Sequence, residues 1–86
     1  LGAKKVCERA LELSNERKVI PFTVSDAEAV DACQAFLNDH RTLVEPACGA
    51  TLALLYGKKI DLKQYKNILV IVCGGSTVTV ESLQSL

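Results

Sequence analysis

Apolar residues recur along most of this chain at the spacing of helices, and two short runs are typical of β-strands. Residues 4–17 carry one apolar face at helical spacing. Residues 19–24 predict a short extended segment, where Pro21 removes a ladder donor and favours a sheet edge. Ser25 and Glu28 have the spacing of a capping box, which predicts a helix ending near His40. Its inward face would carry Val30, Cys33, Phe36 and Leu37.

The second half of the chain predicts another helix between Pro46 and Gly57. Proline suits a first helical turn and glycine suits a helix exit. The helix is apolar nearly all round and must therefore be covered on several sides, while Glu45 at its start is charged. Residues 58–66 form a polar connection with one short helical turn near residues 62–65, and Thr79 is expected to cap a final helix.

Residues 68–72, Ile-Leu-Val-Ile-Val, predict a strand that is buried on both faces. The strand ends at Cys73, and Gly74, Gly75 and Ser76 follow. Ligands of open parallel sheets bind beyond the carboxyl ends of the strands, so this thiol is expected at a ligand-binding edge of an α/β protein. Two strands cannot cover these apolar surfaces. We therefore expect a segment of a larger α/β sheet protein, or half of an intimate oligomer.

Three interpretations of the Cys-Gly-Gly-Ser turn remain open from the residues alone. It could cradle a phosphate, present a reactive cysteine, or be a tight turn with a buried thiol. Neither GxGxxG nor GxxxxGK[ST] is present, which disfavours a nucleotide site. A catalytic cysteine would need a histidine base, and His40 is expected to be exposed at the end of another helix. Two interpretations of Glu45 also remain open, because it is either a partner for the helix dipole or a functional carboxylate.

Composition narrows the class of protein. The chain has 86 residues, with ten basic and ten acidic side chains, which argues against nucleic-acid binding. No apolar stretch is long enough to span a membrane. The four cysteines are widely spaced and lack zinc-site spacing, so we expect reduced thiols and a cytoplasmic protein. The chain begins at Leu1 rather than methionine, so we expect it to be processed, trimmed or excerpted.

Two motifs together resemble one enzyme family. Residues 43–50, Leu-Val-Glu-Pro-Ala-Cys-Gly-Ala, and residues 70–76, Val-Ile-Val-Cys-Gly-Gly-Ser, are similar to the eukaryotic L-serine dehydratase/L-threonine deaminase family. The start at residues 1–4, the helix start at 26–30 and Thr79 fall in the family's order. The resemblance implies a fold type II pyridoxal-phosphate (PLP) enzyme. Residues 1–86 would be a single segment, the C-terminal portion of its large domain, with an open, mostly parallel sheet flanked by helices.

The resemblance also implies roles for particular residues. Cys73, with Gly74 beside it, would face the pyridine nitrogen of pyridoxal 5'-phosphate, and Glu45 would lie near the ring edge. Leu1 and Ala3 match positions whose backbone carbonyls help to hold a monovalent cation such as K⁺. No catalytic residue is expected here, because the family's Schiff-base lysine motif, substrate-carboxylate loop and phosphate cup have no counterpart in the chain.

The implied reaction is α,β-elimination of L-serine to pyruvate and ammonia, or of L-threonine to 2-oxobutanoate and ammonia. The segment alone is not expected to be active without the missing N-terminal portion of the enzyme, and the family is typically homodimeric. Neither a nucleic-acid nor a membrane partner is expected. The alternative is a non-catalytic regulatory or interaction module derived from the same fold. A small nucleotide-binding domain is a third option, which the missing phosphate motifs disfavour.

Overall fold

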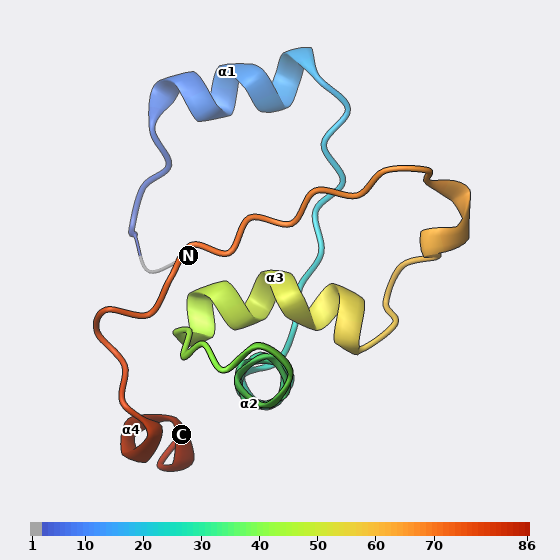
Figure 1. Ribbon diagram of the computed structural model, residues 1–86. Coiled ribbons are helices and arrows are strands. Elements are labelled where there is room, and N and C mark those ends of the chain that lie inside the picture. Colours follow the sequence, from blue (N-terminus) through green and yellow to red (C-terminus); the bar gives the residue numbers. More distant parts are fainter. Residues whose placement is uncertain (1–2) are drawn as a thin grey trace.

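The structure, a computed structural model, describes residues 3–86 and is helical (Figure 1). Its elements are α1 (Glu8–Glu16), α2 (Asp26–His40), α3 (Pro46–Tyr56), the 3₁₀ helix η1 (Leu62–Gln64) and α4 (Val80–Gln84). No helix in this described range is long and apolar enough to cross a bilayer.

The core lies where α2 packs against α3, and Figure 1 shows α3 crossing over α2, which is viewed end-on. Its buried residues are Ala32, Cys33, Val44, Cys48, Leu52, Ala53 and Leu83. Gly49 allows the two helices to approach closely. A Cβ at this position would overlap the carbonyl oxygen of Ala29 and lie 2.5 Å from the Cys33 sulfur.

The helix ends of α2 and α4 confirm the predicted capping. The Glu28 amide donates to Ser25 Oγ at 3.1 Å, and the Ser25 amide donates to Glu28 Oε1 at 3.3 Å. Helix α2 then ends at His40, as expected. Thr79 caps α4 by accepting a hydrogen bond from the Ser82 amide at 3.1 Å. Local sequence therefore determines where these helices begin.

Helix α3 also has the predicted bounds, but its exit differs in detail. It begins at Pro46, and Gly57 follows its last residue, Tyr56. Gly57 has a φ of −84°, whereas the next residue, Lys58, has the left-handed φ of 52°. The conformation that favours glycine thus falls one residue after the glycine.

Helix α1 is shorter than residues 4–17, and its apolar face does not pack in this chain. It begins at Glu8 and buries no residue. Val6 is 65% exposed and Leu11 is 58% exposed. Figure 1 shows α1 at the upper edge, apart from α2 and α3.

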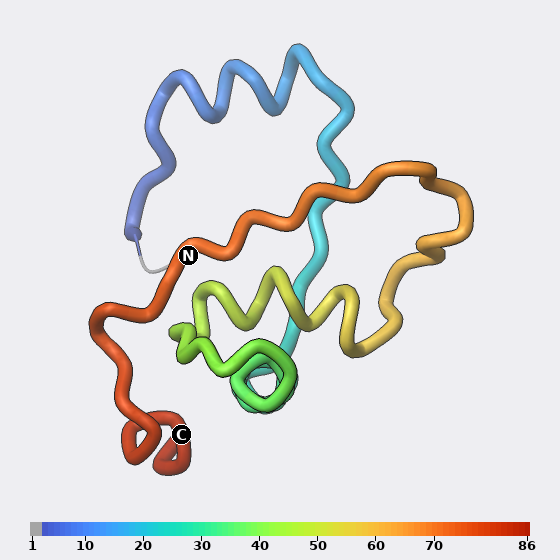
Figure 2. Tube along the Cα trace, viewed as in Figure 1, coloured from blue at the N-terminus to red at the C-terminus, as the bar shows by residue number. Residues whose placement is uncertain are grey.

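The predicted sheet is not confirmed. Residues 19–24 and 67–73 are extended, as Figure 2 shows, yet no strand is present within residues 3–86. The prediction that residues 68–72 are buried on both faces is wrong for this chain, since Leu69 is 87% exposed and Ile71 is 64% exposed. The physical reason is that a ladder requires a neighbouring strand, and these two extended segments do not pair with each other.

Candidate functional site

Cys73 lies at the end of the extended segment, where the chain turns towards α4. Its side chain is exposed. The next residue, Gly74, has a φ of +117°, a conformation that other residues rarely adopt. Within residues 3–86, no atom outside Gly74 and its two chain neighbours lies within 4 Å of the position that a Cβ of Gly74 would occupy. The thiol is therefore followed by a glycine with open space on its side-chain face.

The second glycine of the turn packs directly against the residues that precede α3. A Cβ at Gly75 would lie 2.6 Å from the Leu43 carbonyl oxygen and 2.8 Å from the Val44 Cα. Beside this contact, the Glu45 amide donates a hydrogen bond to the Gly74 carbonyl oxygen at 3.0 Å. The structure thus places Glu45 beside the turn of Cys73 and Gly74, and the family resemblance assigns these three residues to one site.

The Glu45 side chain binds the segment after the turn rather than its own helix. It makes no capping hydrogen bond to α3. Its Oε2 accepts a hydrogen bond from Thr77 Oγ1 at 2.9 Å. The sequence analysis did not identify Thr77, because the two residues are 32 positions apart and share no motif. Glu45 is therefore held to residues 74–77 through both its backbone and its carboxylate.

The surroundings of Cys73 favour the neutral thiol. Desolvation by the nearby chain raises the pKa of Cys73, and a hydrogen bond with Cys48 and the charges of Cys48 and Glu45 raise it further. Cys48 is fully buried, and so is Cys33. Desolvation also raises the pKa of Cys33, with a smaller effect of Cys48. The prediction that Cys33 lies on the inward face of its helix is confirmed.

The reactive-cysteine interpretation gains no support. A nucleophilic thiol needs a lowered pKa or an adjacent base, and the pKa of Cys73 is raised. His40 is exposed at the end of α2, and its ring lies tilted against that of Phe36 with a centroid separation of 4.5 Å. The groups that act on the Cys73 thiol are Cys48 and Glu45.

The proposed cation ligands are not tested. Leu1 lies outside the described residues, and Ala3 is exposed at their beginning. A K⁺ site at these two carbonyls stays a prediction.

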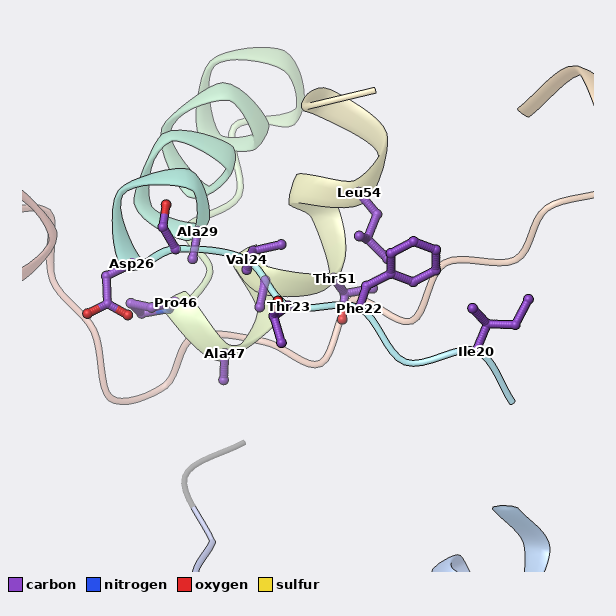
Figure 3. Close-up of a pocket in the computed structure, with 12 residues that line it drawn as sticks. Ile20, Phe22, Thr23, Val24, Asp26, Ala29, Pro46, Ala47, Thr51 and Leu54 are labelled. Carbon is purple, nitrogen blue, oxygen red and sulfur yellow. The ribbon is translucent and has the colours of Figure 1, made fainter. Parts of the chain in front are cut away.

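An apolar groove of about 560 Å³ lies beside the first turns of α3 (Figure 3). It is lined mainly by residues 20–26 and one face of α3, with Phe22, Thr51 and Leu54 at one end and Asp26 and Pro46 at the other. Neither Cys73 nor Glu45 lines it. The groove is therefore separate from the thiol site and shows that α3 is not covered on all sides by this chain.

Comparisons with known proteins agree on one enzyme family. Residues 1–74 match the family described as pyridoxal-phosphate dependent enzyme. L-serine dehydratase of Dictyostelium discoideum is 47% identical over 90 residues, which cover 100% of this chain and 25% of that protein. Human L-serine dehydratase/L-threonine deaminase is 40% identical over 94 residues, which cover 100% of this chain and 29% of that protein.

A solved structure agrees with these relatives. The crystal structure of a fungal L-serine ammonia-lyase from Rhizomucor miehei matches with a TM-score of 0.82 and 37% sequence identity. The match covers 96% of this chain and 28% of that chain. The chain thus spans only 25% to 29% of the length of these proteins.

Proposed function

Because the chain belongs to the family of pyridoxal-phosphate dependent enzymes, we propose that it forms the part of an L-serine/L-threonine ammonia-lyase that contacts the cofactor pyridine nitrogen. The observation that carries the proposal is the Cys73–Gly74 turn held by Glu45 against the start of α3. The names of the relatives, L-serine dehydratase and L-serine dehydratase/L-threonine deaminase, supply the substrate class. The segment would be the C-terminal part of the large domain of a cytoplasmic, homodimeric enzyme.

The described residues fit one edge of a pyridine ring. The thiol of Cys73 is exposed, and its raised pKa favours the neutral form; a thiol is a weak hydrogen-bond donor and acceptor that suits an uncharged ring nitrogen. The described residues leave the side-chain face of Gly74 open, where a flat group could approach the turn. Glu45 would lie near the edge of the ring. These residues form one wall of a site, and the remaining contacts would come from other parts of the full-length protein.

The chemistry divides between the cofactor and these residues. When bound, pyridoxal phosphate supplies an electron sink for the negative charge that develops at the substrate Cα. Cys73 would contact the ring nitrogen without providing a negative charge, so that the protonated form of this nitrogen is not stabilised. The Glu45–Gly74 hydrogen bond would keep the sulfur at a fixed position relative to α3. Such a neutral contact suits loss of a β-hydroxyl better than transamination.

The full-length protein tests the proposed function directly. We expect it to bind pyridoxal phosphate and to form pyruvate from L-serine and 2-oxobutanoate from L-threonine, measured by reduction of the 2-oxo acid with a coupled dehydrogenase. D-Serine serves as the matched control substrate. A protein that binds the cofactor but forms no 2-oxo acid from either substrate would favour the non-catalytic module instead.

A further inference from the structure

The turn after Cys73 has little structure of its own. Two consecutive glycines, Gly74 and Gly75, follow the cysteine, and glycine has the most backbone freedom to lose when a chain becomes ordered. Within the turn, the Val78 amide donates to the Gly75 carbonyl oxygen at 3.3 Å, which is long for a backbone hydrogen bond. The position of the turn therefore depends on the groups that it contacts outside itself.

Glu45 supplies two of these outside contacts from a rigid element. Its carbonyl oxygen accepts hydrogen bonds from the Cys48 and Gly49 amides, both at 2.9 Å, so the first turn of α3 fixes its backbone. The Glu45 amide donates to the Gly74 carbonyl oxygen at 3.0 Å, and Glu45 Oε2 accepts from Thr77 Oγ1 at 2.9 Å. The start of α3 is thus bonded to the turn at two points, before and after the second glycine.

We propose that Thr77 is a positioning residue, whose hydrogen bond to the Glu45 carboxylate holds the turn of Cys73 and Gly74 against α3 in the conformation that binds pyridoxal phosphate. The proposal rests on the proposed function in one respect, namely that this turn contacts the cofactor ring. Thr77 itself does not contact the ring in this proposal. It acts through Glu45 and the backbone of the turn.

The physical argument is one of preorganisation. A hydrogen bond from a hydroxyl to a carboxylate is charge-assisted, and the half-buried Glu45 has its backbone already fixed. Without the Thr77 donor, the bond to Gly74 alone would have to restrain a turn with two glycines, and other turn conformations would become populated. The apparent Kd of a ligand rises by the inverse of the fraction of protein that is competent to bind it. Loss of the donor should therefore weaken cofactor binding without removing any contact to the cofactor.

The first measurement is the affinity of the full-length apoprotein for pyridoxal phosphate, titrated by the visible absorbance of the bound cofactor. Thr77→Val and Thr77→Ala remove the donor and should raise the Kd by about two- to tenfold, the usual effect of one hydrogen bond on an equilibrium. Thr77→Ser retains the donor and should restore the parent value. Thr51→Val replaces an exposed threonine of α3 and is the matched control, with an unchanged Kd.

The second measurement is hydrogen exchange of the apoprotein, which separates a local effect from a general loss of stability. In Thr77→Val, exchange should accelerate at the Glu45 and Val78 amides, whose hydrogen bonds end at Gly74 and Gly75. Exchange of the amides in the middle of α2 should not change. Thr51→Val should exchange like the parent throughout.

A double-mutant cycle tests whether Thr77 acts through the carboxylate. Glu45→Ala removes the acceptor, and Thr77→Val should then raise the Kd no further, because each variant removes the same hydrogen bond. An effect of Thr77→Val that persists in full beside Glu45→Ala would assign Thr77 a role that does not involve Glu45.

Three results would overturn the proposal: an unchanged Kd in both donor-free variants, that persistent effect, or exchange that accelerates in α2 as much as at the turn. None of these readouts needs turnover. A protein with the expected Kd and exchange changes that forms no 2-oxo acid would refute the proposed function and leave the role of Thr77 standing. An active protein whose Kd and exchange ignore Thr77 would do the reverse.

Discussion

The Glu45 amide donates a hydrogen bond to the carbonyl oxygen of Gly74 at 3.0 Å, which joins the start of α3 to the turn after Cys73. The two residues lie in different motifs of the sequence. Gly75 makes the approach possible, since a Cβ there would meet backbone atoms of Leu43 and Val44. The cysteine turn and the Glu-Pro helix start therefore form one structural unit.

Gly75→Ala should disrupt this unit. The added methyl group would lie 2.6 Å from the Leu43 carbonyl oxygen, and backbone cannot yield as a flexible side chain can. We expect the free energy of unfolding of the full-length protein to fall by about 1–3 kcal/mol, the usual cost of overpacking. Urea denaturation measures the change. Ser76→Ala, at the next and exposed position, is the control and should stay within about 0.5 kcal/mol of the parent.

Gly49→Ala tests the contact between α2 and α3. Helix propensity alone would favour alanine by about 1 kcal/mol in a helix interior. The new Cβ would, however, overlap the Ala29 carbonyl oxygen and crowd the Cys33 sulfur. We expect the clash to prevail and to destabilise the protein by about 1–3 kcal/mol in urea denaturation. Thr51→Ala, at an exposed position of α3, is the control. A Gly49→Ala protein that is more stable than its parent would contradict the described packing.

The starts of α2 and α3 could be predicted from the sequence because their causes are local. Ser25 and Glu28 stand three residues apart and satisfy each other's backbone groups, so the start of α2 needs no distant contact. Pro46 fixes the start of α3 in the same way. In the candidate site, Glu45 lies beside the turn of Cys73 and Gly74, and the role of these three residues at a cofactor stays a prediction.

Features that depend on distant partners could not be predicted in the same way. The apolar run at residues 68–72 has the composition of a buried strand, but burial requires neighbours, and Leu69 is exposed in this chain. The Thr77–Glu45 hydrogen bond joins residues 32 apart, and no spacing rule identifies such a pair. Lys59, in the polar connection after α3, forms an ion pair with Glu28 of α2 at 2.6 Å, and no local pattern identifies this pair.

This ion pair predicts a pH dependence of stability. The hydrogen bond with Lys59, followed by the bond from the Ser25 amide, lowers the pKa of Glu28 below its ordinary value of 4.5. A carboxylate whose pKa is lowered by folding stabilises the folded state above its ordinary pKa, and this contribution is lost as the pH falls through the lowered value. Glu28→Gln should therefore lower the thermal midpoint at neutral pH and narrow its difference from the parent in acid.

Thermal unfolding followed by circular dichroism at several pH values measures this effect. Asp31→Asn changes an exposed carboxylate on the same helix and should leave the pH dependence close to that of the parent. The pair is partly exposed, so added salt should reduce the effect of Glu28→Gln. If the Glu28→Gln protein had the same acid sensitivity as its parent, the Lys59–Glu28 ion pair would not contribute to the pH dependence of stability.

Cys73→Asp examines the neutral contact proposed for the cofactor nitrogen. A carboxylate at this position would favour a protonated nitrogen, which a neutral thiol cannot do. We expect 2-oxo acid formation by the full-length protein to fall by about tenfold, which corresponds to about 1.4 kcal/mol. The share of substrate diverted to transamination should rise, because a protonated ring withdraws more charge from the Cα. Cys73→Ser keeps a neutral group and should retain the product ratio, as measured by chromatography of the products. If Cys73→Asp retained that ratio as well, the sulfur would have a role in packing rather than in the electronics of the ring.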